Sequence, residues 1–283
     1  MIDTTFLKEL DRFNLILKKR VLSNYQGERQ SHAYGQGLVF ADYKDYVPGD
    51  DFRAIDWKVF ARTNKFYIKK YEEERDLSVH VIVDASASMN YGRRITKFEY
   101  ASMIGVGFAY MALKSNEKFN FSTFAKDLNY LKARKGMGQL LGIVERLEKL
   151  KIDGISNFNQ SLEEYKQYIK SRSFVVIISD FLYDIEEIRS VLSRFTKHEV
   201  IAIQVLDPEE RKLSLYGDVL LEDSELHTKL RTFISNRLLK SYRDKIEHHI
   251  FSVKDACEKA GADFVSITTD RPVFEAFYAA MRA

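Results

Sequence analysis

The sequence predicts an α/β protein with a mainly parallel sheet, covered by helices on both faces and preceded by a small β-rich subdomain. Apolar segments such as LSVHVIVD (77–84) and SFVVIISD (173–180) alternate with segments whose apolar residues recur at helical spacing. Residues 25–75 instead carry four glycines and short alternating runs, which indicate tight turns and short strands. Three domain segments are therefore expected: 1–24, 25–75 and 76–283.

The expected elements follow one another simply along the chain. Residues 1–24 contain an amphipathic pattern and are predicted to form an N-terminal helix. In the α/β domain the expected strands are 77–84, 118–125, 128–135, 173–180, 199–207 and 262–270. The expected helices are 96–114, 138–150, 157–170, 184–197, roughly 240–260 and 272–282. Residues 217–234 are expected to form an inserted hairpin.

Composition excludes several classes of protein. Hydrophobic residues make up 45% and charged residues 30% of the 283 residues, which is typical of a globular chain, and the net charge of +3 gives nucleic-acid binding little support. The N-terminus is too charged for a signal peptide, and no run approaches the roughly 18 apolar residues of a membrane span. The single cysteine, Cys257, fits a reducing compartment. We therefore expect a cytoplasmic protein with no membrane span and no nucleic-acid partner.

The stretch VIVDASASM (81–89) is the strongest indication of a site. Asp84 ends an apolar strand, and Ser86 and Ser88 follow at every second position, so the three side chains can project to one side of an extended loop. Asp180 ends a second apolar strand, and ligands of open α/β sheets collect beyond the carboxyl ends of the strands. Carboxylates and hydroxyls suit a hard divalent cation. The alternative interpretation is that Asp84 and the serines only cap the following helix.

This arrangement resembles the metal-ion-dependent adhesion site (MIDAS) of von Willebrand factor A domains. Asp84, Ser86 and Ser88 match the first part of that pattern, and Asp180 matches its last part. The segment GISNFNQSL resembles the family's Gly-x-Thr-Asn loop, with Ser156 where threonine is usual. The resemblance implies a von Willebrand factor A-like fold and one Mg²⁺ or Mn²⁺ ion on Asp84, Ser86, Ser88, Ser156 and Asp180.

A longer stretch resembles the bacterial family catalogued as domain of unknown function 58. That family has a Tyr-x-x-Gly-Asp-Asp-x-Arg-x-Ile-Asp-Trp signature just before an A-type domain. The matching residues are Tyr46, Gly49, Asp50, Asp51, Arg53, Ile55, Asp56 and Trp57. The resemblance implies a cytoplasmic protein that works beside a MoxR-type AAA+ ATPase. From the residues themselves we expect the signature to be mainly structural, with Arg53 paired to a carboxylate.

Two functions are compatible with such a site. The first is a metal-dependent protein-binding module, in which a carboxylate of a MoxR-type ATPase or of its client completes the coordination of the ion. The second is a metal-dependent hydrolase, which needs a general base near the ion. The loops 84–92, 154–158 and 180–184 contain no His or Glu, and Asp184 is their only spare acid. We therefore expect a binding protein, with no catalytic residues and no organic cofactor.

Overall fold

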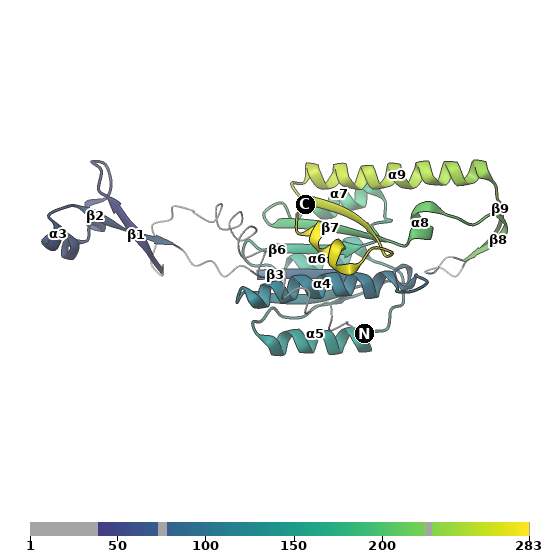
Figure 1. Ribbon diagram of the computed structural model, residues 1–283, viewed down its shortest axis with the longest axis horizontal. Helices are drawn as coiled ribbons and strands as arrows, with labels where there is room; N and C mark the ends of the chain where they lie inside the picture. The colour runs from purple at the N-terminus through teal and green to yellow at the C-terminus, as the bar shows by residue number, and fades with distance from the viewer. Residues whose placement is uncertain (1–38, 73–77, 223, 225–227, 283) are drawn as a thin grey trace. The chain divides into compact units, whose positions relative to one another are not determined.

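The computed structural model describes residues 39–72, 78–222, 224 and 228–282 of the chain. The chain divides between Asp76 and Leu77 into a small unit before this boundary and a large unit after it, and the two are described separately (Figure 1). The N-terminal helix predicted at 1–24 lies outside the described residues.

A six-stranded sheet forms the centre of the large unit, in the order β10-β7-β6-β3-β4-β5. Every neighbouring pair is parallel except β4 and β5. The strands are β3 (Ser78–Asp84), β4 (Lys118–Phe124), β5 (Leu128–Asn129), β6 (Phe174–Ser179), β7 (Glu199–Leu206) and β10 (Asp263–Thr268). The strand expected at 128–135 is thus much shorter, because only Leu128 and Asn129 pair with β4, and Arg134 forms an isolated bridge with Phe119.

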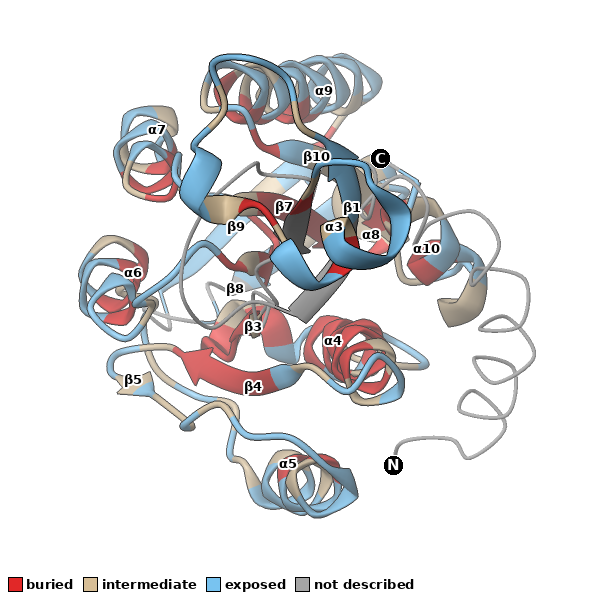
Figure 2. Ribbon diagram, turned by 90° about the vertical axis from the view of Figure 1, so that its left-hand side faces the viewer, coloured by how far each residue is buried: buried red, intermediate tan, exposed pale blue. Residues whose placement is uncertain are grey.

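Helices cover both faces of this sheet, as expected (Figure 2). Helices α6, α7 and α9 bury their apolar residues on one face, in a cluster that includes Ile82, Ile177 and Val191. Helices α4 and α10 lie on the other face, where the rings of Phe108 and Phe277 have centroids 5.1 Å apart. The bounds are α4 (Lys97–Lys114), α5 (Met137–Lys149), α6 (Phe158–Lys166), α7 (Ile185–Ser193), α8 (Pro208–Lys212), α9 (Asn236–Lys259) and α10 (Val273–Ala280).

Two helix starts predicted from local sequence are confirmed. Thr96 caps α4 in a capping box with Glu99, and the side chain of Asp184 accepts a hydrogen bond from Glu186 N at the start of α7. These caps fix where α4 and α7 begin, after the loops that follow β3 and β6.

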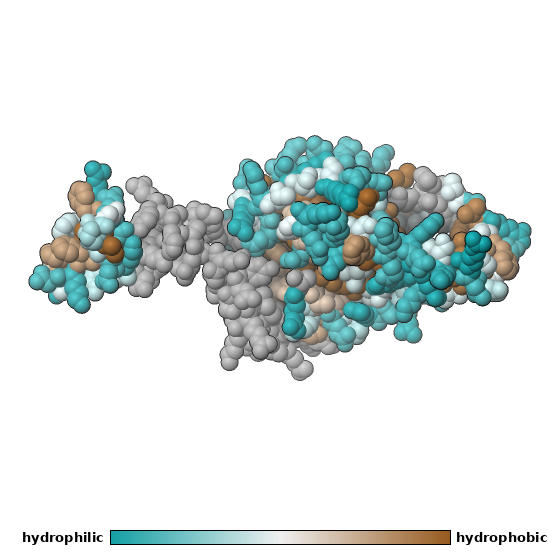
Figure 3. Space-filling view, turned by 90° about the horizontal axis from the view of Figure 1, so that it is seen from above, coloured by the Kyte–Doolittle hydropathy of each residue, from teal (hydrophilic) through white to brown (hydrophobic). Residues whose placement is uncertain are grey.

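An antiparallel hairpin follows α8 and consists of β8 (Gly217–Glu222) and β9 (Lys229–Ile234). It carries exposed apolar side chains, among them Leu220 (61% exposed) and Phe233 (61%). Seen from above, the surface of the large unit is mostly hydrophilic, with apolar patches at the end that carries this hairpin (Figure 3). No helix among the described residues is long and apolar enough to cross a membrane.

The small unit pairs β1 (Val39–Asp45) with β2 (Tyr67–Glu72) around helix α3 (Trp57–Thr63). The acidic residues of its signature have structural roles: Asp56 caps α3, Asp51 caps a short 3₁₀ turn, and Asp50 pairs with Lys44 at 2.9 Å. Arg53, for which a carboxylate partner was expected, has its guanidinium 6.0 Å from the centre of the Phe52 ring.

Candidate metal centre

The sheet brings the two predicted aspartates together. Asp84 is the last residue of β3, Asp180 directly follows β6, and these strands are parallel neighbours. The side chains are almost fully buried, with residue exposures of 0% for Asp84 and 2% for Asp180. Ser86 and Ser88 lie on the turn after β3, which we call the serine turn. Ser86 directly precedes the 3₁₀ segment Ala87–Asn90, and Ser88 lies within it.

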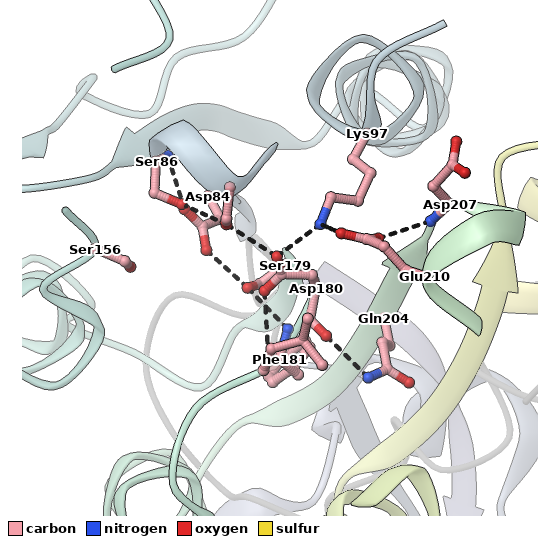
Figure 4. A network of polar contacts seen from close by, with 12 residues as sticks. Asp84, Ser86, Lys97, Ser156, Ser179, Asp180, Phe181, Gln204, Asp207 and Glu210 are labelled. Carbon is pink, nitrogen blue, oxygen red and sulfur yellow. Dashed lines mark hydrogen bonds and ion pairs between the residues drawn. The ribbon is translucent and has the colours of Figure 1, made fainter. Parts of the chain in front are cut away.

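The hydroxyls of this turn connect the two strand ends (Figure 4). Ser86 Oγ and Ser88 Oγ are 3.1 Å apart, and Ser88 Oγ donates to Asp180 Oδ2 at 2.9 Å. Adjacent ligands of an octahedral ion with bonds of about 2.0–2.1 Å are about 3 Å apart, so the spacing of the serine oxygens fits Mg²⁺.

Asp84 is held by three donors. Its Oδ1 accepts from Ser86 N at 2.9 Å, and its Oδ2 accepts from Ser179 Oγ at 2.7 Å and from the hydroxyl of Tyr183. Burial, followed by the charge of Asp180, raises the pKa of Asp84 to about 6. A bound cation would oppose both effects and lower the pKa of Asp84, because it stabilises the ionised carboxylate.

Ser156 joins the cluster through a residue that the sequence analysis missed. Its Oγ lies 2.7 Å from the Tyr183 hydroxyl, which also donates to Asp84. The ring of Tyr183 stacks on Phe158 with centroids 4.5 Å apart. The loop of Ser156 is tied to the serine turn by a hydrogen bond from Ala87 N to Gly154 O of 2.9 Å. All five predicted residues thus lie in one connected network.

Lys97 is the second residue that the sequence analysis missed. Its Nζ is 2.9 Å from Asp180 Oδ2 and 2.6 Å from Glu210 Oε1, and its side chain is 0% exposed (Figure 4). Burial lowers the pKa of Lys97, but the attraction of Asp180 and Glu210 outweighs burial and raises this pKa above its usual value. Lys97 therefore places an ammonium group directly beside the Asp180 carboxylate of the candidate site.

The backbone between Asp180 and Tyr183 is strained. Phe181 is fully buried and has φ of 50°, an unfavourable conformation for a bulky residue that costs on the order of 1–3 kcal/mol. Neighbouring contacts hold it there: Ser179 Oγ accepts from Phe181 N at 3.1 Å, and His249 Nε2 lies 2.7 Å from Phe181 O. Such strain is concentrated at functional sites.

The donor set fits one hard cation. Among the described residues, no group of three or more His, Cys, Asp or Glu side chains could hold a metal ion. The ligands predicted from the sequence are two carboxylates and three hydroxyls. All are oxygen donors, which suits Mg²⁺ or Mn²⁺ better than zinc.

Tyr183→Phe should tighten Mn²⁺ binding severalfold and lower the stability of the metal-free protein by about 1–3 kcal/mol. The phenol donates to Asp84 at an acceptor position that a cation would use, and it lies 2.7 Å from the Ser156 hydroxyl. Its loss frees that position of Asp84 and leaves both residues without this partner. Titration calorimetry and urea unfolding measure the two effects, with Tyr168→Phe as a control away from the site. Weaker Mn²⁺ binding would instead make Tyr183 a support for the donor set.

Together, the strand order, the aspartates at the ends of β3 and β6 and the serine turn define an α/β protein of the von Willebrand factor A type. The family model described as "Protein of unknown function DUF58" matches residues 42–250. The chain belongs to this family, which confirms the resemblance found in the sequence.

Relatives in mycobacteria cover nearly the whole chain. "Uncharacterized protein Rv1480" of Mycobacterium tuberculosis (strain ATCC 25618 / H37Rv) and "Uncharacterized protein Mb1516" of Mycobacterium bovis are each 25% identical over 274 residues. These matches span 95% of this chain and 86% of each relative. "Uncharacterized protein YeaD" of Bacillus subtilis is 26% identical over 98 residues, or 35% of this chain and 23% of YeaD.

Solved structures with a similar fold include BatB from Bacteroides thetaiotaomicron, with a TM-score of 0.44, 11% identity and coverage of 73% of this chain and 97% of BatB. The VWA domain of SpRpn10 matches with a TM-score of 0.43 and 13% identity, over 71% of this chain and 93% of that domain.

Proposed function

We propose that the protein is a metal-ion-dependent protein-binding module. One Mg²⁺ or Mn²⁺ ion would be held by oxygens of Asp84, Ser86, Ser88, Ser156 and Asp180. The observation that carries the proposal is the convergence of Ser86, Ser88 and Asp180 at contacts of 3.1 and 2.9 Å beside buried Asp84. A role for Asp84 and the serines in helix capping alone does not account for a hydrogen bond to the end of another strand.

The chain's own residues prepare a binding surface and contribute no bond-breaking chemistry to it. The ion would supply positive charge with a coordination position for a partner's Asp or Glu, and such attraction is strong in a partly desolvated site. Ser88 holds Asp180 at 2.9 Å, while Ser179 holds Asp84 at 2.7 Å. Preorganised donors lower the cost of ordering the site when it binds.

Binding is a better proposal than hydrolysis. A hydrolase needs a general base near the ion. Asp184, the one spare acid on the loops, has its carboxylate turned to the backbone of its own helix, where it accepts from Glu186 N at 2.8 Å. We therefore propose a non-enzymatic role.

The proposed partner is a MoxR-type AAA+ ATPase or a client of that ATPase, as the family resemblance implies. The role would be that of an adaptor or chaperone-like protein in the cytoplasm. A partner carboxylate would bind at the ion, so association should require the ion and the aspartates that hold it.

The test is co-purification with a MoxR-type ATPase from the same organism, with Mg²⁺ and with chelator. Wild type should retain the ATPase, while Asp84→Ala and Asp180→Ala should lose it at least tenfold. Glu145→Ala, at an exposed carboxylate on α5, is the matched control and should bind normally. Chelator alone also removes the ATPase's own Mg²⁺, so the aspartate variants decide. If both variants bind the ATPase normally, the metal site is not the surface that contacts the partner.

A further inference from the structure

Lys97 is an unusual residue for its position in the fold. It is the first residue of α4, where the positive end of the helix dipole disfavours a cation. It is nevertheless completely buried, between a carboxylate of the candidate metal centre and one of α8. A buried ammonium group at this position is stabilised by the negative charge of the carboxylates around it.

The charges of the cluster do not balance without a further cation. Lys97 faces Asp180 and Glu210, and Asp84 lies beside Asp180. Three carboxylates and one ammonium leave an excess of two negative charges, which one divalent ion neutralises. Ser88 Oγ and Leu182 N also donate to Asp180, so its carboxylate keeps two donors if the ammonium is removed.

We infer that Lys97 is a fixed internal cation that sets the charge of the metal site, and that Glu210 partly offsets it. Lys97 thereby lowers the affinity for the divalent ion and keeps the loaded site close to neutral. A neutral loaded site repels an incoming carboxylate less than a negative one, which favours a partner's Asp or Glu on the ion. This inference rests on the proposed function.

A role in charge setting makes a prediction that a structural role does not. If Lys97 and Glu210 act through charge, removing one should change Mn²⁺ affinity in the opposite direction from removing the other. If the pair only holds α4 against α8, breaking it from either side should change the affinity in the same direction.

The experiment is Mn²⁺ titration calorimetry on the metal-free full chain. Lys97→Met should bind Mn²⁺ about tenfold more tightly, which corresponds to about 1.4 kcal/mol. Glu210→Gln should bind about three- to tenfold more weakly, and the double variant should lie between them. Glu209→Gln, at the neighbouring carboxylate on α8, is the matched control and should match wild type within twofold, because its ion-pair partner is Arg93 at 3.7 Å.

The outcomes separate this inference from the proposed function. Wild type that binds no Mn²⁺ overturns both. Wild type that binds, with both single variants weakened or both strengthened, overturns the role of Lys97 alone. If Lys97→Met does not fold, Glu210→Gln decides, because unchanged or tighter binding relative to Glu209→Gln contradicts the inference. Thermal melting is a second readout, in which Mn²⁺ should raise the Tm of Lys97→Met more than that of wild type.

Discussion

Asp84→Ala should abolish the binding of Mn²⁺, with at least a hundredfold loss of affinity. Asp84 is fully buried, at 0% exposure, and its charge accounts for half of the net negative charge that would attract the ion. The fold should survive, because burial and Asp180 raise the pKa of this carboxylate and its ionised form is not itself stabilising without metal.

Calorimetry with wild type, Asp84→Ala and Asp84→Asn measures this effect. The asparagine variant keeps the shape of the side chain and an acceptor for Ser179 and Tyr183, so it separates loss of charge from loss of packing. Circular dichroism of each variant controls for the fold. Equal Mn²⁺ affinity in wild type and Asp84→Asn would show that the carboxylate of Asp84 does not bind the ion.

Lys97→Met should lower the free energy of unfolding of the metal-free protein by about 3–5 kcal/mol. The substitution leaves Asp180 and Glu210 without the cation that lies 2.9 and 2.6 Å from them. Glu210 keeps some contact with solvent, at 21% side-chain exposure, whereas Asp180 has 3%. Most of the cost therefore falls on Asp180. Urea unfolding in the presence of chelator measures it.

The double variant Lys97→Met/Glu210→Gln controls for the geometry of the pair. It removes one charge of each sign, so it should recover part of the lost stability, and saturating Mn²⁺ should recover more. A loss below about 1 kcal/mol for Lys97→Met, the range of an exposed ion pair, would contradict the role of a buried counter-cation.

The parallel sheet was predictable from the sequence, because it follows from local patterns. The same patterns suggested Asp84, Ser86, Ser88 and Asp180 as ligands, whereas Ser156 was suggested only by the family resemblance, and the binding of an ion by these five residues stays a prediction. Apolar segments that end in Asp84 and Asp180 indicate buried strands with an aspartate at their carboxyl ends, and β3 and β6 are the two central strands of the sheet. The capping residues Thr96 and Asp184 indicate the helix starts beside them in the same way. The short β5 was not predictable from its alternating residues, because its length depends on pairing at the edge of the sheet.

Lys97 and Tyr183 were missed because their roles depend on contacts between distant parts of the chain. Lys97 is 83 positions from Asp180 and 113 from Glu210, and Tyr183 is 99 positions from Asp84. One local signal was available for Lys97. A lysine directly after the N-cap of a helix opposes the helix dipole, and that conflict points to a nearby negative charge.

The strand order has a consequence for how the chain is synthesised. β3 pairs with β6, and Asp84 and Ser179 at their ends are 95 positions apart. At about 5–20 residues per second, a ribosome needs on the order of 5–20 s to make that interval. During this time the apolar strand VHVIVD has emerged without one of its two neighbours, and the nascent chain lacks Asp180 and Glu210. The ammonium of Lys97 and the oxygen donors, the last of which is Asp180, can therefore assemble only after about two thirds of the polypeptide has been made. A product truncated before that point would present β3 to chaperones and would lack the proposed ion site.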